Sequence, residues 1–317
     1  MRAGGACFIS WRAGEDFGEP TMINAVVLTQ QFINGLAIGM AYALIAVGFS
    51  LVFGILRLVN FAHGAVYAFG AQIALVFIGM QVGVAPAILI AMVIAGLLGV
   101  LIDKTALQPL RKKKSMPIAN LITTIGIAHI LTNLMTIWFG SQTRGFPALF
   151  DFGMVEVAGV RINSAQLMMC LVALILMSVL TIIIHKSKIG LAIRATEQNT
   201  KAASLMGINI NLVISFTFFL AGASAAIAGG LIASHYRIVY PAMGFNAGLK
   251  AFSAAVLGGI GSLPGSIIGG LIVGVSESMA AAFLGSAYRD SVAFVILILV
   301  LIIRPTGLFG KKAIMKV

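Results

Sequence analysis

Residues 164–233 read SAQLMMCLVALILMSVLTIII, then HKSKIGLAIRATEQNTKAASLMGININ, then LVISFTFFLAGASAAIAGGLIA. The first and third parts are apolar runs of about 20 residues, the length that a helix needs to cross a hydrocarbon core of about 30 Å. The part between them, residues 185–211, is the longest polar segment between two apolar runs in the chain. The stretch therefore predicts two membrane-spanning helices joined by a polar loop that is long enough to have its own structure.

The composition of the whole chain indicates the same class of protein. Of 317 residues, 60% are hydrophobic and only 9% are charged, whereas soluble domains carry about 25% charged residues. The apolar runs are continuous, which excludes the alternating pattern of a β-barrel. The 36 glycines are typical of spanning helices that pack closely. We expect an all-α polytopic membrane protein.

The basic residues are concentrated between the apolar runs. Residues 103–117, 185–211 and 304–317 are strongly basic, whereas residues 140–163 balance two arginines against two acids. The positive-inside rule places the three basic segments, and with them the C-terminus, in the cytoplasm and the fourth segment outside. The net charge of +12 is explained by this rule, so we exclude nucleic acid as a partner.

Apolar runs predict spans at residues 64–80, 84–102, 118–139, 164–184, 212–233 and 287–303. Residues 24–58 hold either two short spans or one long one. Residues 248–283 are interrupted at residues 261–265, and each half is short for a full span. We expect two short crossing helices there or a broken, re-entrant pair, which is tolerated where it is buried or lines a cavity. The total is eight to ten transmembrane helices.

The two ends of the chain differ from the rest. Residues 1–21 have no sustained apolar run and hold three of the nine acidic residues, which predicts a disordered tail or a gene-model extension before Met22. Residues 22–310 are predicted to form one transmembrane domain, with residues 311–317 as a basic cytoplasmic tail. Cys7 and Cys170 are too few for a disulfide framework or a metal site.

The sequence carries no recognisable catalytic chemistry. It has no G-x-x-x-x-G-K followed by Ser or Thr, so it lacks a nucleotide-binding loop of its own. Its four histidines have no metal-ligand spacing, and no Ser, His and acid set stands out. We therefore predict no enzyme activity, no metal and no cofactor. Within the predicted spans Glu277 is the one acid, which disfavours an ion-coupled transporter.

The polar loop at residues 185–211 is predicted to contain a short amphipathic helix around residues 195–206. Thr196 and Asn199 are suitable helix-start residues, and Gly207 is a stop signal. Ala202, Leu205 and Met206 recur at helical spacing and form one apolar face. This helix lies on the membrane or docks on a partner protein. The alternative is a solvated connecting loop.

Several residues near the apolar interior are candidates for a translocation pathway. Lys250 and Glu277 are expected to bond to each other or to line a pathway, because an unpaired charge there is costly; Lys250 alternatively extends to the interface. The glycines of residues 258–270 permit either an unwound pore segment or simple tight packing. Asn60 and His63 lie in a segment that is either a turn or part of the pathway. The candidate set is Asn60, His63, Lys250, Gly258, Gly259, Gly261 and Glu277.

Several motifs in register resemble the branched-chain amino acid ABC importer permeases of the LivH type. They are Asn34-Gly35 with residues 42–46 (YALIA), residues 60–64 (NFAHG), Arg194-Ala195 with residues 202–208 (AASLMGI), residues 250–265 (KAFSAAVLGGIGSLPG) and residues 305–310 (PTGLFG). They occur in the order of that family and cover most of residues 22–310.

The resemblance implies a permease subunit in a bacterial inner membrane. It would pair with a second, LivM-like permease and with two cytoplasmic ATPases, and it would receive substrate from a periplasmic binding protein. In that family the loop matching residues 190–208 contacts the ATPase. The implied coupling residues are Gly190, Arg194, Ala195, Glu197, Ala202, Leu205, Met206 and Gly207.

Two alternatives stay open at this point. One is a self-sufficient secondary transporter or channel for a small solute, in which residues 185–211 are a connector. The other is a permease of the same family that carries urea or short amides.

Overall fold

The computed structural model describes residues 25–113, 115–149, 153–157 and 160–310. The expected N-terminal extension, residues 1–21, and the basic tail, residues 311–317, lie outside the described residues. Within the described part, eight helical segments are long and apolar enough to cross a membrane: Ala25–Leu56, Ala62–Gly79, Val84–Lys112, Ile118–Phe139, Ser164–Lys186, Ile210–Tyr236, Leu263–Phe283 and Ser286–Ile303. The expected helical membrane class is confirmed, at the lower limit of the expected count.

The N-terminal half contains three long helices, α1 (Ala25–Leu56), α2 (Ala62–Gly79) and α3 (Val84–Ile102). The alternative of two short spans within residues 24–58 is wrong, since α1 is one helix of 32 residues. It has no internal proline, and Gly35 and Gly39 make close contacts with α11. Tight packing thus preserves a helix that glycine content alone would weaken.

The expected loop at residues 103–117 is helical over most of its length. The helix continues from α3 through the π-helical turn η1 (Asp103–Leu107) into α4 (Gln108–Lys112). The Asp103 carboxylate is fully buried. It accepts hydrogen bonds from Arg111 Nη1 at 2.6 Å and from Ser215 Oγ at 2.9 Å. Because these partners satisfy the Asp103 carboxylate, the helix continues past this residue. From the sequence alone, an acid at this position indicates the end of a span.

The middle of the chain alternates long helices with short elements. The helices are α5 (Pro117–Phe139), α6 (Ser164–Lys186), α7 (Lys188–Gln198), α8 (Thr200–Leu205) and α9 (Ile210–Tyr236). Four short strands, which the sequence did not predict, are β1 (Arg144–Gly145), β2 (Met154–Val157), β3 (Val160–Asn163) and β4 (Ile238–Val239). β1 pairs antiparallel with β4, and β2 with β3. These pairings bring the β1–β3 region and the end of α9 together.

The glycine-rich segment forms a helical pair, α10 (Met243–Gly258) and α11 (Leu263–Phe283), followed by the 3-10 turn η2 (Ser286–Tyr288) and α12 (Arg289–Ile303). The break falls at residues 259–262, slightly earlier than expected. As a result α10 has 16 residues, whereas α11 has 21 and is long enough to span. The expectation that both halves are short therefore holds for α10 and is wrong for α11.

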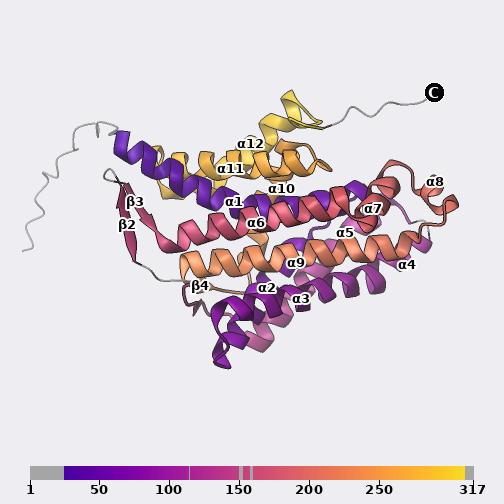
Figure 1. Cartoon of the computed structure of the whole chain (residues 1–317), viewed down its shortest axis with the longest axis horizontal. Helices are drawn as coiled ribbons and strands as arrows, with labels where there is room; N and C mark the ends of the chain where they lie inside the picture. Colours follow the sequence, from indigo (N-terminus) through magenta and orange to yellow (C-terminus); the bar gives the residue numbers. More distant parts are fainter. Residues whose placement is uncertain (1–24, 114, 150–152, 158–159, 311–317) are drawn as a thin grey trace, which may run out of the picture.

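The bundle has two chemically different ends, visible in Figure 1 as its left and right sides. The strands lie at the end that we call the hairpin end. The end of α1, α4, α7, α8 and residues 304–310 lie at the opposite end, which we call the basic end. α1 and α9 form the core, with 83% and 78% of their most apolar windows buried, whereas the corresponding values for α5 and α12 are 11% and 6%.

Candidate functional site

The polar loop at the basic end folds as two helices, not one. Ser187 begins α7 by accepting a hydrogen bond from the Gly190 N–H at 2.9 Å. Asn199 begins α8 by accepting from the backbone of Lys201 and Ala202, both at 3.0 Å. The expectation of a single helix around residues 195–206 is therefore wrong, because the Asn199 cap starts a new helix within it. We call α7 and α8 together the elbow.

The expected start and stop signals of the elbow have different outcomes. Asn199 is a helix start as expected, whereas Thr196 lies inside α7, is buried and donates its hydroxyl proton to the Ala192 carbonyl at 2.7 Å. Gly207 has φ +84° directly after α8, the left-handed conformation that ends a helix. Gly207 as a stop signal is therefore confirmed.

Two of the candidate coupling residues hold the elbow to the bundle. Arg194 Nη1 donates to the carbonyl oxygens of Ile184 and His185, both at 3.0 Å, and so satisfies the end of α6. A side chain at Gly190 would collide with the backbone of Ile183 and Ile184. Gly190 and Arg194 thus fix where α7 leaves α6.

The tip of the elbow presents apolar side chains to its surroundings. Leu205 is 89% exposed and Met206 is 83% exposed, and Ala202 is also exposed. Of the α8 residues, Ala203 faces inward and is buried. Large exposed apolar side chains that are grouped at one place mark an interaction surface more often than isolated ones do.

Glu197 connects the elbow to two other elements. The Glu197 side chain lies next to Gly54, near the end of α1: a methyl group added to Gly54 would lie 3.3 Å from Glu197 Cδ. It also lies close to Gly261, in the break between α10 and α11, where an added methyl group would lie 3.8 Å from Glu197 Oε1. The break therefore lies at the basic end, and α7 contacts both the core helix α1 and the α10–α11 turn.

The C-terminal segment closes the same turn. Leu308 N–H donates to the Leu257 carbonyl at 2.9 Å, and Phe309 N–H donates to the Gly258 carbonyl at 3.0 Å. Gly259 has φ +100° and packs against the Gly310 backbone. We call this pairing of residues 305–310 with the end of α10 the C-terminal clamp. Apart from the motif at residues 305–310, no feature of the sequence predicts it. Gly258, Gly259 and Gly261 thus serve tight packing and a sharp turn together.

Lys250 and Glu277 lie together in a buried ionic cluster. Lys250 Nζ lies 2.9 Å from Glu277 Oε1 and 2.6 Å from Asp290 Oδ1. Arg289 Nε lies 2.7 Å from the same Glu277 oxygen. Tyr42 OH donates to this oxygen at 3.3 Å. The expected bond between Lys250 and Glu277 is confirmed, and the two cations are balanced by two carboxylates.

The ionic cluster lies between α1, α10, α11 and α12. Tyr42 precedes the end of α1 at Leu56 by fourteen residues, and Glu277 follows the start of α11 at Leu263 by fourteen residues. At 1.5 Å per residue, each lies about 21 Å from the basic end. Glu277 is 1% exposed and Lys250 is 7% exposed, whereas the side chain of Asp290, at the start of α12, is 59% exposed. Lys250 is therefore buried, and its ammonium group bonds to a carboxylate at the surface of the bundle.

Asn60 and His63 lie where the chain turns from α1 into α2. Asn60 Oδ1 accepts from the Ala62 N–H at 3.1 Å, and a ring nitrogen of His63 lies 3.2 Å from the Ile45 carbonyl oxygen. The His63 ring packs edge-on against Phe49, with 4.7 Å between centroids. Both side chains are buried, and their contacts are those expected of residues at a turn between two helices. Gly64, the next residue, packs on Gly244 of α10.

Sequence reasoning missed five members of these polar networks. Asp290 and Arg289 fall within the last span and Asp103 within the third, so the expectation that Glu277 is the one intramembrane acid is wrong. Tyr42 and Tyr236 complete the ionic cluster, the latter by accepting from Arg289 Nη2 at 2.7 Å. The adjacent Arg-Asp pair at the start of an apolar run is the signal that would have found two of them.

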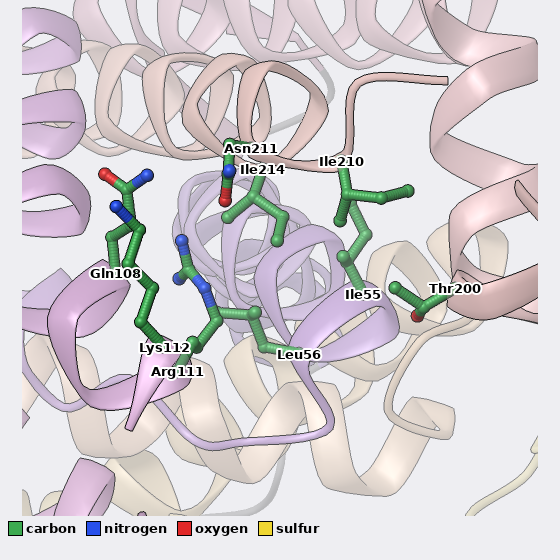
Figure 2. A pocket seen from close by; sticks show the side chains of 9 residues that line it. All are labelled: Ile55, Leu56, Gln108, Arg111, Lys112, Thr200, Ile210, Asn211 and Ile214. Carbon is green, nitrogen blue, oxygen red and sulfur yellow. The ribbon is translucent and has the colours of Figure 1, made fainter. Parts of the chain in front are cut away.

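A cavity of about 380 Å³ lies at the basic end, where α1 ends and α9 begins. Figure 2 shows Arg111 of α4 extending into it. None of its lining residues was in the candidate pathway set.

A multi-pass helical bundle that lacks a nucleotide-binding loop and carries an exposed apolar elbow has the features of a transport subunit driven by another protein. The model of the family described as "Branched-chain amino acid transport system / permease component" matches residues 31–301. The chain belongs to this family.

Curated relatives agree along nearly the whole chain. The high-affinity branched-chain amino acid transport system permease protein LivH of Escherichia coli K12 is 42% identical over 91% of this chain and 97% of its own length. The corresponding permease protein BraD of Pseudomonas aeruginosa is 40% identical with the same coverage. The chain is the permease component of a branched-chain amino acid ABC import system, a multi-pass membrane subunit and not an ATPase. The alternative of a self-sufficient transporter is not supported.

Proposed function

We propose that this chain is driven by two cytoplasmic ABC ATPases that dock on the elbow. It also pairs with a second, LivM-like permease and receives branched-chain amino acids from a periplasmic binding protein. The basic end faces the cytoplasm of a bacterial cell and the hairpin end faces the periplasm. The charge distribution supports this orientation, because the lysine- and arginine-rich segments at α4, the elbow and residue 304 share one end.

The observation that carries the proposal is the exposure of Leu205 and Met206 on a rigidly capped element. Asn199 and Gly207 define both ends of α8. Because α7 is tied to α6 through Arg194, a push on α8 is transmitted to the bundle instead of being absorbed by a flexible loop. Glu197 then relays the movement to α1 and to the α10–α11 turn, which it contacts.

Copurification of the ATPases tests this docking role. The double variant Leu205→Asp with Met206→Asp should retain its fold and lose the ATPases. The matched control changes the same residue types at the opposite end, Leu284→Asp with Met80→Asp, where the exposures are 62% and 65%. Retention of the ATPases by the elbow variant at the level of the control would contradict the proposal.

We further propose that α10 is re-entrant and forms one wall of the translocation pathway. Gly244 and Gly248, in its first turns, pack on Gly64 beside His63. His63 in turn contacts Gly48 of α1. These contacts support a start of α10 beside buried residues of α1 and α2, and the other end of α10 is held at the basic end by residues 308–309. Lys250 and Gly258 lie on α10, and Gly259 and Gly261 follow it directly.

Glu277→Gln tests the pathway role, because it retains the shape of the side chain and removes its charge. We expect slower uptake of leucine into proteoliposomes that contain the whole transporter. Glu156→Gln, in an exposed ion pair at the hairpin end, is the control. Uptake at the wild-type rate by a stably folded Glu277→Gln variant would make Glu277 a structural residue without a role in transport.

A further inference from the structure

The cavity at the basic end is built from four elements that are distant in sequence. Its volume is about 380 Å³, within the range of about 300–1,000 Å³ that small-molecule sites occupy. Four branched aliphatic side chains form its apolar wall: Ile55, Leu56, Ile210 and Ile214. Figure 2 shows these side chains and the Arg111 guanidinium around one space. The cavity thus has an apolar wall and a cationic group opposite each other.

Arg111 is anchored at the edge of the cavity. Nη1 donates to buried Asp103 at 2.6 Å, and Asp103 is itself held by Ser215 of α9. Nη2 is enclosed by protein atoms and has no hydrogen-bond partner among the described residues. The side chain as a whole lines the cavity and is 19% exposed. Its fixed positive charge therefore favours an anion in the cavity.

Other polar groups complete the lining. Lys112 adds a second cation, and Gln108, Thr200 and Asn211 add side chains that donate or accept hydrogen bonds. In Figure 2 the Asn211 amide lies on the side toward which the Arg111 guanidinium extends. The nearest carboxylate, Asp103, is already paired with Arg111. The lining thus offers charged donors for a carboxylate and neutral acceptors for an ammonium group.

We infer that this cavity binds an aliphatic α-amino acid, with its carboxylate on Arg111 and its side chain against Ile55, Leu56, Ile210 and Ile214. A free phosphate would leave the apolar wall unused. A phospholipid headgroup would need access from lipid, whereas α1 and α9, which supply the apolar wall, are the two most buried of the candidate spans. A carboxylate side chain from a partner protein would fill little of about 380 Å³.

The inference deepens the proposed function and rests on its orientation, in which the basic end is the side where cargo is released. An amino acid bound there would contact α4, α8 and the ends of α1 and α9 at once. The cavity is then a release-side site for the same class of molecule that the transporter carries.

Equilibrium binding of radiolabelled leucine tests the inference. The purified transporter is placed in nanodiscs without ATP and without the binding protein, so the measurement does not depend on ATPase coupling. Arg111→Lys keeps the charge next to Asp103 and removes the planar guanidinium that lines the cavity. It should weaken leucine binding about tenfold or more, the effect of losing one charge-assisted hydrogen bond. Arg304→Lys, at an exposed position of the same end, should leave binding unchanged.

A second variant keeps the test valid if Arg111→Lys folds poorly. Thr200→Trp fills the cavity from an exposed position of α8 and should abolish the same binding, whereas Lys201→Trp, its exposed neighbour outside the lining, should not. Leucinol, which lacks the carboxylate, should compete poorly. Leucine binding that is insensitive to both Arg111→Lys and Thr200→Trp would overturn the inference. So would Arg111-dependent binding of inorganic phosphate or phosphatidylglycerol in place of leucine.

Discussion

The ionic cluster and the elbow are the two polar regions of this permease, and they are built in opposite ways. The cluster takes Tyr42, Lys250, Glu277, Arg289 and Asp290 from four helices and joins them inside the bundle. The elbow is one continuous piece of chain, and its largest apolar side chains, Leu205 and Met206, are exposed. The described partners of the cluster all belong to its own chain, and Glu277 Oε2 is buried without a hydrogen-bond partner among the described residues. The elbow leaves apolar surface that a partner has to cover.

This difference separates what the fold needs from what transport needs. A charge in the cluster stabilises its neighbours only while its partners are present, so removal of one member leaves another buried and unpaired. A side chain at the tip of the elbow contacts little of its own chain, so the fold does not depend on it. Four substitutions test this contrast, in order of their expected effect on the stability of the chain.

The largest effect should come from Glu277→Ala. It removes the oxygen that Lys250, Arg289 and Tyr42 share. Breaking a buried ion pair in this way lowers the free energy of unfolding by about 3–5 kcal/mol. Denaturation of the purified protein in detergent measures it. The control is Glu156→Ala, whose ion pair with Arg161 is exposed on both sides and should contribute at most about 1 kcal/mol.

A smaller effect is expected from Gly307→Ala in the C-terminal clamp. Gly307 has φ +75°, and an added Cβ would lie 2.5 Å from the Gly259 backbone. The left-handed conformation alone destabilises by about 1–3 kcal/mol for a non-glycine residue, and the close approach adds to it. Faster amide hydrogen exchange at residues 256–262 would report the opened clamp. Gly207→Ala is the control, because Gly207 has φ +84° and open space around it. It measures the destabilisation by the left-handed backbone conformation without a steric contact.

The third substitution, Asn199→Ala, removes the cap of α8. Loss of a capping side chain lowers stability by about 1 kcal/mol, and here the loss should be confined to the elbow. Hydrogen exchange should become faster at Lys201 and Ala202, whose N–H groups donate hydrogen bonds to Asn199 Oδ1. It should remain unchanged in α9. Asn199→Ser, which still accepts a hydrogen bond, should restore protection. Uniformly faster exchange across the bundle would show that the elbow and the core are not separable.

The smallest effect on the fold should come from Leu205→Asp with Met206→Asp. Surface substitutions of this kind stay within about 0.5 kcal/mol. The same variant should nevertheless lose ATPase-driven uptake. The elbow variant should therefore lose activity and keep its stability, whereas Glu277→Ala should lose both. A large decrease in the stability of the elbow variant would contradict this contrast between the elbow and the ionic cluster.

The sequence predicted the long helices well because their signal is local. The spans at residues 118–139, 164–184 and 212–233 follow directly from apolar runs, and the observed helices differ by a few residues. Failure came where stability depends on distant partners. Asp103 reads as the end of a span until Arg111, two turns later, and Ser215, far along the chain, are placed beside it. The four strands have only two or four residues each, which is too short for a clear local signal, and they exist through pairing.

The candidate sites were predictable to a similar extent. A bond between Lys250 and Glu277 is one of the options that the sequence predicts, because an unpaired charge in an apolar environment is costly. Arg289, Asp290 and Tyr42 were not, since only the packing of α1, α11 and α12 brings them to that pair. Asn199 was recognised as a cap from its residue type. Thr196 is an equally suitable cap by residue type. Only its buried position within α7 shows that it is not a helix start.

The C-terminal clamp has a consequence for the order of assembly during synthesis. Residues 305–310 follow α10, α11 and α12 in the chain, yet Leu308 and Phe309 donate the hydrogen bonds that the carbonyls of Leu257 and Gly258 accept. α10 and α11 are therefore synthesised before the end of α10 acquires its final partners. A chain released early, by a stop codon after Arg304, would have every span and an unfinished turn beneath its elbow.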